Sequence, residues 1–272
     1  MIRKFLKLLV LLSLLIILPY GIAFHLHNNI KNEKTFAAEE DQQLEDYCLH
    51  VLANEVSSDY EDEMLKVQAI LVRTTIYKEV QENGVDALKN SDETLDFLWL
   101  QRLKKAWDET EGQVIMFDNE LALVPFHQIS CGKTRSGEDV LGSKDYPYLQ
   151  SMECQMDISA PRQIENILIS AKEMEIKEWD KAGYVMKVSV DGEEMSGEEF
   201  REMYGLASSC FEFQQFENDA RIITKGVGHG LGLSQYTANE MAKDGKTCEE
   251  ILQFFFPGTE IKEVAEILWK VE

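Results

Sequence analysis

Residues 226–238 have the sequence Gly226-Val-Gly-His-Gly-Leu-Gly-Leu-Ser-Gln-Tyr-Thr-Ala238, the most distinctive stretch of the chain. Glycine occupies every second position from 226 to 232, so the residues on either side of His229 have no side chain. Glycine is favoured where φ is positive or where another group approaches closely. The run lacks the Lys-Ser/Thr pair of a phosphate loop and fits the dinucleotide fingerprint poorly. Two interpretations stay open: a ligand-facing loop around His229, or a tight strand–loop–helix junction in which His229 packs.

The composition is that of an acidic globular protein. A length of 272 residues accommodates one large domain or two small ones, and 44% hydrophobic residues with four tryptophans suffice for a core. The formal net charge of −22 argues against nucleic-acid binding, which needs a basic face. It also argues against adhesion to an anionic membrane surface. A neutral or sugar-like substrate is compatible with this charge.

Residues 1–24 predict a transmembrane signal anchor. Arg3, Lys4 and Lys7 precede an apolar run over 8–24, which is just long enough to span a ~30 Å hydrocarbon core. The basic flank is expected to stay in the cytoplasm, with the rest of the chain outside. A cleaved signal peptide ending at Gly21-Ile-Ala23 is the alternative. The polar residues 25–43 are expected to form a stalk.

Five cysteines offer no CxxC spacing, and their odd number leaves at least one free thiol. His127, Cys131 and Cys154 would form a zinc site only with a fourth ligand or water. Isolated buried thiols are the commoner outcome, so we expect no cofactor and keep zinc as an alternative. Metal-dependent hydrolysis using His127, Cys131 and His229 is the corresponding minor hypothesis for function.

Residues 44–272 are predicted to form a single mixed α+β domain. Three N-terminal helices are expected: from residue 44 to about 55, from a cap at 57–59 to about 80, and an amphipathic segment at 95–107 with Phe97 and Leu98 in its apolar pattern. A β-rich middle and C-terminal helices follow. The expected strands are 114–117, 121–129, 148–152, 184–190, 211–216 and 221–225, and the expected later helices are 196–205, 234–243 and 248–256.

The segments above resemble those of the stage II sporulation protein D and amidase-enhancer family, in the family's order, over about residues 44–262. The glycine run is similar to its GHGxGMSQYGA element, and Leu52-Ala-Asn-Glu-Val56 with 65–74 resembles its first element. Shorter similarities lie at 110–115, 125–134, 147–151 and 258–261. The chain departs from the pattern at Val56-Ser57, where the family has Met-Pro, and at Thr237, where it has glycine.

The resemblance implies a lytic transglycosylase that cleaves peptidoglycan glycan strands, preferring strands without stem peptides. It assigns the catalytic acid to Glu55. Such an acid must be protonated near neutral pH, and partial burial at a helix end would raise its pKa. No second carboxylate is needed, because the sugar's own C6 hydroxyl attacks and a 1,6-anhydro ring forms. Without the motif, a solvated helix-end carboxylate would be the simpler interpretation of Glu55.

The matching positions also suggest substrate-binding residues: Gln68, Arg73, His229, Ser234 and Gln235. Arg73 has an equally good alternative role in packing two helices, and Tyr236 is expected to be structural. The resemblance implies action during forespore engulfment, in the mother-cell membrane facing the forespore, with stage II sporulation proteins P (an amidase) and M as partners. A non-catalytic, glycan-binding enhancer of a cell-wall amidase is the alternative function.

Overall fold

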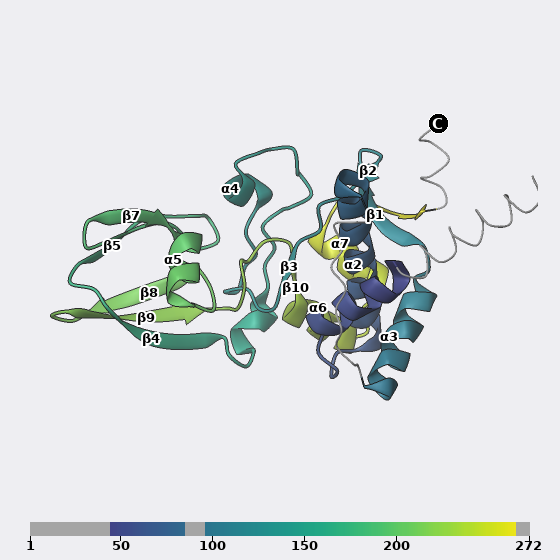
Figure 1. Cartoon of the computed structure of the whole chain (residues 1–272), viewed down its shortest axis with the longest axis horizontal. Coiled ribbons are helices and arrows are strands. Elements are labelled where there is room, and N and C mark those ends of the chain that lie inside the picture. Colours follow the sequence, from purple (N-terminus) through teal and green to yellow (C-terminus); the bar gives the residue numbers. More distant parts are fainter. Residues whose placement is uncertain (1–43, 85–95, 265–272) are drawn as a thin grey trace, which may run out of the picture. The chain divides into compact units, whose positions relative to one another are not determined.

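A computed structural model describes residues 44–84 and 96–264 (Figure 1). The predicted anchor at 1–24 and stalk at 25–43 lie outside the described residues. The chain divides into two units, Met1–Cys48 and Leu49–Glu272, and the sheets belong to the second. Within 44–84 and 96–264, no helix is both long and apolar enough to cross a membrane. The mixed α and β content predicted from the sequence is confirmed.

The long helix α2 (Asp62–Asn83) is central to the helical part of the unit, and half of its residues are buried. It contacts α3, α6, α7 and β1. A helix ending at residue 55 precedes it, as predicted. The predicted cap at 57–59 is wrong, because α2 starts at Asp62 and its N-cap Glu61 makes no side-chain cap. A tertiary contact serves instead: the Glu61 amide donates to Asn239 Oδ1 at 2.8 Å.

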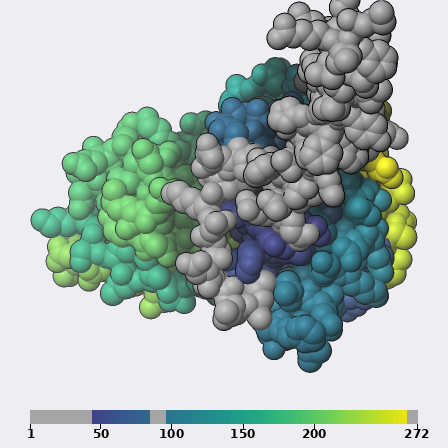
Figure 2. Space-filling view, turned by 45° about the vertical axis from the view of Figure 1, so that its right-hand side comes forward, coloured from purple at the N-terminus to yellow at the C-terminus, as the bar shows by residue number. Residues whose placement is uncertain are grey.

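Helix α3 (Phe97–Glu109) begins at Asp96, whose carboxylate accepts from the amides of Leu98 and Trp99. Its buried residues are Leu103, Ala106 and Trp107. Phe97 and Leu98, which belong to the predicted apolar pattern, are instead exposed. Figure 2 shows the outer side of α3 (blue) at the molecular surface. The fully buried residues of the helix therefore lie from Leu103 onward.

The C-terminal helices α6 (Gln235–Lys243) and α7 (Cys248–Phe255) form as predicted. They pack with α2 and a small antiparallel sheet in which β1 (Gln113–Phe117) lies between β2 (Glu120–Leu121) and β11 (Glu260–Glu263). The main core is built from apolar side chains of these elements and of residues next to them, including Met64, Val67, Ile70, Leu71, Ile115, Leu233, Ala238, Ile251, Leu252, Phe255 and Phe256.

Two predicted strands are wrong. The segment 121–129 contains only the end of β2 and the two-residue strand β3 (Phe126–His127), which pairs in parallel with β10 (Leu233–Ser234). Residues 148–152 form no strand, because Tyr148 and Leu149 are buried in the main core from an irregular segment. Short helices, α4 (Gly137–Leu141) and the 3₁₀ helix η2 (Gln155–Ser159), lie on either side of that segment.

Residues 164–225 form two further three-stranded antiparallel sheets around a second core (Figure 1). One has the order β4 (Ile164–Ser170), β9 (Asp219–Lys225), β8 (Phe211–Gln215). The other has the order β5 (Met174–Trp179), β6 (Val185–Val190), β7 (Glu193–Ser196). Helix α5 (Gly197–Tyr204) starts with the capping box of Ser196 and Glu199 and stops at left-handed Gly205. Strands β4, β5, β7 and β11 were not predicted from the sequence.

Candidate functional site

Glu55 is the last residue of the helix that ends at residue 55, and its side chain is accessible to solvent. Desolvation by the surrounding protein nevertheless raises the pKa of the Glu55 carboxyl above its usual value of 4.5. A raised pKa keeps a larger fraction of the carboxyl protonated near neutral pH. This is the property that a proton donor to a glycosidic oxygen needs.

Gln235 is buried at the start of α6, and its Nε2 donates to the backbone carbonyl of Glu55 at 2.8 Å. The bond joins residues 180 positions apart. It satisfies a carbonyl at the end of a helix, where intrahelical donors are absent. Gln235 therefore holds the main chain of Glu55, and the structure brings these two predicted site residues together.

The four alternate glycines of the run all have positive φ, between 75° and 110°. A Cβ atom at Gly232 would lie 2.0 Å from the Pro125 carbonyl oxygen, and one at Gly230 would lie 2.3 Å from Cζ of Tyr184. Cβ atoms at Gly226 and Gly228 would each meet atoms of residues 127–131 at 2.7 Å. The group that approaches the bare backbone is thus the protein's own chain.

Residues 125–131 lie along the glycine run over most of its length. Leu233 and Ser234 pair in parallel with Phe126 and His127, and Ile129 exchanges both backbone hydrogen bonds with Val227. This arrangement supports the tight-junction interpretation of the run over the ligand-facing one. Gly226 and Gly232 are needed where the two backbones approach each other, and Gly228 and Gly230 leave room for the side chains of His127 and Tyr184.

His229 and His127 lie side by side, with ring centroids 5.7 Å apart. The His229 Nδ1 accepts from the Leu231 amide at 3.1 Å, and His127 Nδ1 lies 3.2 Å from the Leu231 carbonyl oxygen. Burial lowers the pKa of both rings, and burial together with His229 takes the pKa of His127 to about 3. Both imidazoles are therefore neutral at neutral pH.

Ser234 is fully buried and serves as the N-cap of α6. Its hydroxyl lies 2.8 and 2.9 Å from the two carboxylate oxygens of Asp157, which also accept from the Thr237 hydroxyl at 2.7 Å and the Ser130 amide at 2.7 Å. The hydroxyl predicted to bind substrate is thus turned inward. Sequence reasoning missed Asp157, because it lies in a short 3₁₀ helix with no periodic signal.

Arg73 is buried, and its guanidinium binds the backbone at the end of α3. It donates to the carbonyl oxygens of Trp107, Thr110 and Gln113 at 2.7–3.1 Å and stacks on the Trp107 ring at 3.8 Å. The helix-packing alternative accounts for this arrangement, and a grip on substrate does not. Gln68 is also fully buried, and its amide has no hydrogen-bond partner among the described residues.

The residues considered for zinc do not converge. The Cys131 thiol donates to the Ala182 carbonyl at 3.3 Å, and the Nδ1 of His127 is used by Leu231. Over the described ranges, no three His, Cys, Asp or Glu side chains are grouped so that they could hold a metal ion. The geometry gives the metal-dependent hypothesis no support.

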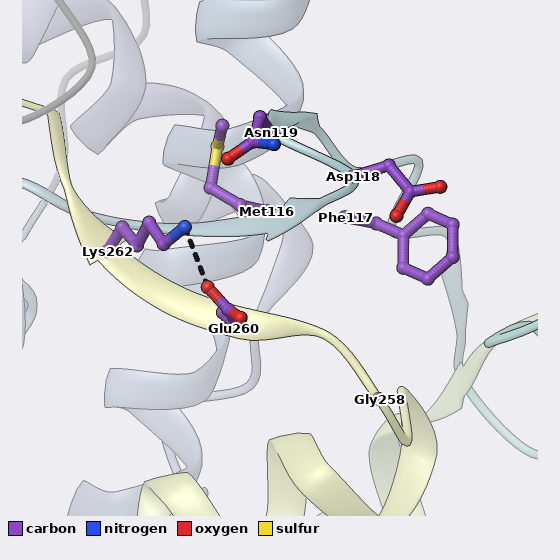
Figure 3. Close-up of a pocket in the computed structure, with 7 residues that line it drawn as sticks. All are labelled: Met116, Phe117, Asp118, Asn119, Gly258, Glu260 and Lys262. Carbon is purple, nitrogen blue, oxygen red and sulfur yellow. Dashed lines mark ion pairs between the residues drawn. The ribbon is translucent and has the colours of Figure 1, made fainter.

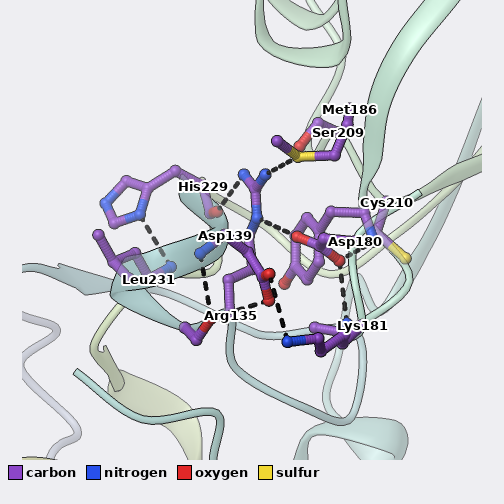
Figure 4. A network of polar contacts seen from close by, with 12 residues as sticks. Arg135, Asp139, Asp180, Lys181, Met186, Ser209, Cys210, His229 and Leu231 are labelled. Carbon is purple, nitrogen blue, oxygen red and sulfur yellow. Dashed lines mark hydrogen bonds and ion pairs between the residues drawn. The ribbon is translucent and has the colours of Figure 1, made fainter. Parts of the chain in front are cut away.

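Arg135 is a buried residue that sequence reasoning missed (Figure 4). Its Nε donates to Asp180 at 2.6 Å, and its Nη1 donates to Glu198 at 2.8 Å and to the His229 carbonyl at 3.3 Å. Its backbone amide donates to the Gly230 carbonyl at 2.8 Å. Arg135 therefore ties the main chain at His229 and Gly230 to the sheets of residues 164–225.

Two cavities contain none of the predicted site residues. One of about 170 Å³ lies at the edge of the β1–β11 sheet, beside the Glu260–Lys262 ion pair (Figure 3). The other, of about 450 Å³, lies beside α4 and includes Tyr146, Leu149 and Lys181 in its lining. Neither cavity extends to Glu55.

Comparison with known proteins gives a consistent class, proteins of bacterial sporulation. The family model "SpoIID: Stage II sporulation protein" matches residues 32–117. Stage II sporulation protein D of Bacillus subtilis (strain 168) is 30% identical over 84% of this chain and 76% of its own. Its counterpart from Bacillus amyloliquefaciens is 28% identical with the same coverage. The chain belongs to the stage II sporulation protein D family.

A more distant relative carries a different name. The amidase enhancer of Bacillus subtilis (strain 168) is 22% identical over 77% of this chain and 39% of its own length. The family model covers Glu55, Gln68 and Arg73 but ends before the glycine run. The link between Glu55 and the run therefore comes from the tertiary structure.

Proposed function

We propose that this protein is a lytic transglycosylase that cleaves peptidoglycan glycan strands to 1,6-anhydro-muramyl products during forespore engulfment. We propose further that it prefers strands without stem peptides. Residues 1–24 would anchor it in the mother-cell membrane, with the domain facing the forespore. Stage II sporulation proteins P and M are the proposed partners.

The observation that carries this proposal is the hydrogen bond from Gln235 to the Glu55 carbonyl. It ties the backbone of Glu55, whose accessible carboxyl has a raised pKa, to the start of α6. Catalytic groups work best when neighbouring contacts hold them in place. Membership of the stage II sporulation protein D family and the resemblance of 52–56 to the family's first element support the same residue.

In the proposed mechanism, protonated Glu55 gives its proton to the glycosidic oxygen as the bond to the anomeric carbon breaks. The C6 hydroxyl of the same sugar attacks the anomeric carbon, and the Glu55 carboxylate takes the hydroxyl proton. The carboxyl returns to its starting state, so one group acts as acid and then as base. Gln235 acts as a positioning residue, because it holds the backbone carbonyl of Glu55.

The alternative function is a non-catalytic enhancer of a cell-wall amidase. The similarity to the amidase enhancer of Bacillus subtilis over 77% of this chain favours it. In that case the domain would bind glycan without breaking it. Glu55 would then be an ordinary accessible carboxylate at a helix end.

Incubation of the purified full chain with glycan strands lacking stem peptides distinguishes the two functions. We expect anhydro-muramyl products from the wild type and a loss of about 10²-fold or more in Glu55→Gln, as for removal of a general acid. Glu61→Gln is the matched control. Glu61 lies just before α2, and its contact with Asn239 is made by the backbone amide, which the substitution leaves unchanged. Undiminished product from Glu55→Gln would reject Glu55 as the acid. Amidase stimulation without any product would establish the enhancer.

A further inference from the structure

Cys131 and Cys210 come from distant parts of the chain and meet at the start of the glycine run. The Cys210 carbonyl accepts from the Lys225 amide at 2.8 Å. The Cys131 amide lies 3.0 Å from the place where a Cβ of Gly226 would stand. Two consecutive residues, Lys225 and Gly226, therefore contact the backbones of both cysteines.

The two thiol groups lie close enough to affect each other's ionisation: Cys210 lowers the pKa of the Cys131 thiol, and Cys131 raises the pKa of the Cys210 thiol. Tyr184 fixes the position of Cys131, because its hydroxyl accepts from the Cys131 amide at 3.3 Å. Cys210 is buried, whereas Cys131 is partly accessible. Figure 4 shows the Cys210 side chain close to Asp180, beside the Arg135 network.

We propose that Cys131 and Cys210 are a redox-active pair that forms an intramolecular disulfide bond. Both cysteines are reduced in the structure. The bond would close a loop containing residues 132–209, which include Asp180 and Glu198, the two carboxylates that hold Arg135. It would thus secure the base of the β-rich segment against residues 125–131.

The oxidant is a disulfide, supplied by a small molecule or by a thiol–disulfide exchange protein. The accessible Cys131, as thiolate, attacks one sulfur of that disulfide; a mixed disulfide forms and the first thiolate leaves. Cys210 then loses its proton and attacks the Cys131 sulfur, which releases the second thiolate. Two cysteine thiols are oxidised to one disulfide, and the external disulfide is reduced to two thiols.

Oxidised glutathione is the probe for the test, applied to the purified full chain in the presence of a chelator. We expect the thiols that react after denaturation to fall from five to three. A non-reducing digest should contain one cross-linked species, joining the peptides of Cys131 and Cys210. The oxidised chain should unfold roughly 5–10 °C higher than the reduced chain, because a cross-link closing a long loop restricts the unfolded state.

Single variants identify the two partners. Cys131→Ser and Cys210→Ser should each abolish the cross-linked peptide and the shift in Tm. Cys248→Ser is the matched control, since Cys248 is also partly accessible but lies at the start of α7, and it should behave as the wild type. Five reactive thiols after oxidation, stable mixed disulfides without the cross-link, or a link through another cysteine would overturn the proposal. These outcomes do not depend on glycan cleavage.

Discussion

Gln235 donates a hydrogen bond of 2.8 Å to the backbone carbonyl of Glu55, and this contact links the two most informative motifs of the chain. One motif supplies the accessible carboxyl, and the other supplies the N-terminus of α6. The Gln235 side chain is buried, whereas Glu55 lies at the surface, so the contact ties an exposed helix end to the interior of the domain. The end of the Glu55 helix is thus fixed by a residue 180 positions later.

Removing this hydrogen bond should lower activity without removing the acid. For Gln235→Leu we expect kcat to fall about tenfold, with KM little changed, because Glu55 loses its support. Gln253→Leu is the matched control: its amide donates to the Thr259 carbonyl at 3.0 Å, away from Glu55. Equal kcat values in the two variants would contradict a positioning role for Gln235.

The raised pKa of Glu55 predicts the basic limb of the pH–rate profile. In the proposed mechanism the proton donor is the protonated carboxyl, so kcat should fall as pH rises through the pKa of Glu55 in the complex. That limb should lie above the usual carboxyl value of 4.5. A profile measured on glycan strands at constant ionic strength checks this. A rate that stays flat from acidic to basic pH would argue against Glu55 as the acid.

His127 predicts a loss of stability in acid. Its pKa is about 3 in the folded protein because of burial, against 6.5 when unperturbed. Below pH 6.5 the His127 imidazole binds a proton in the unfolded chain but stays neutral in the folded chain. The free energy of unfolding therefore falls by about 1.4 kcal/mol per pH unit. Urea unfolding at pH 7 and pH 5 measures this slope. His127→Asn should show a shallower slope, and an unchanged slope would exclude His127 as its source.

In the glycine run, the loss of stability on replacing a glycine by alanine should depend on the space around that glycine. Gly232 and Gly245 have similar positive φ values of 75° and 84°, but only Gly232 faces another backbone. Gly245→Ala should destabilise by about 1 kcal/mol, the cost of the left-handed conformation. Gly232→Ala adds a clash with the Pro125 carbonyl and should cost about 3 kcal/mol or more. Urea unfolding of both variants measures the difference, and equal losses would refute the packing role.

Arg135 and Arg102 both pair with carboxylates, and comparing them tests how burial affects the contribution of an ion pair to stability. The Arg135 side chain is 3% exposed and pairs with Asp180 and Glu198, whereas the Arg102 side chain is 35% exposed and pairs with Asp62. Arg135→Ala leaves buried Asp180 without its cation and should destabilise by about 3–5 kcal/mol. Arg102→Ala should cost about 1 kcal/mol, since water replaces its contacts. Chemical unfolding compares them, and similar values would mean that the Arg135 network contributes little.

Local signals in the sequence were sufficient for much of the secondary structure. The capping box of Ser196 and Glu199 with Gly205 defined α5, and Ser234 defined the start of α6. Asp118-Asn119 and Asp191-Gly192 form turns with positive φ, as their residue types indicate. These features depend on neighbours within a few positions, so composition and spacing determine them.

Contacts between residues far apart in the sequence were decided only by the tertiary structure. The sequence by itself determined the acidic α+β class, most helices and the motif that contains Glu55. It did not determine that Ser234 would face Asp157, that Arg73 would bind the end of α3, or that Cys131 would meet Cys210. The glycine run shows the reason. Glycine permits a close approach, and only the folded chain determines that the approaching groups are residues 125–131 and Tyr184.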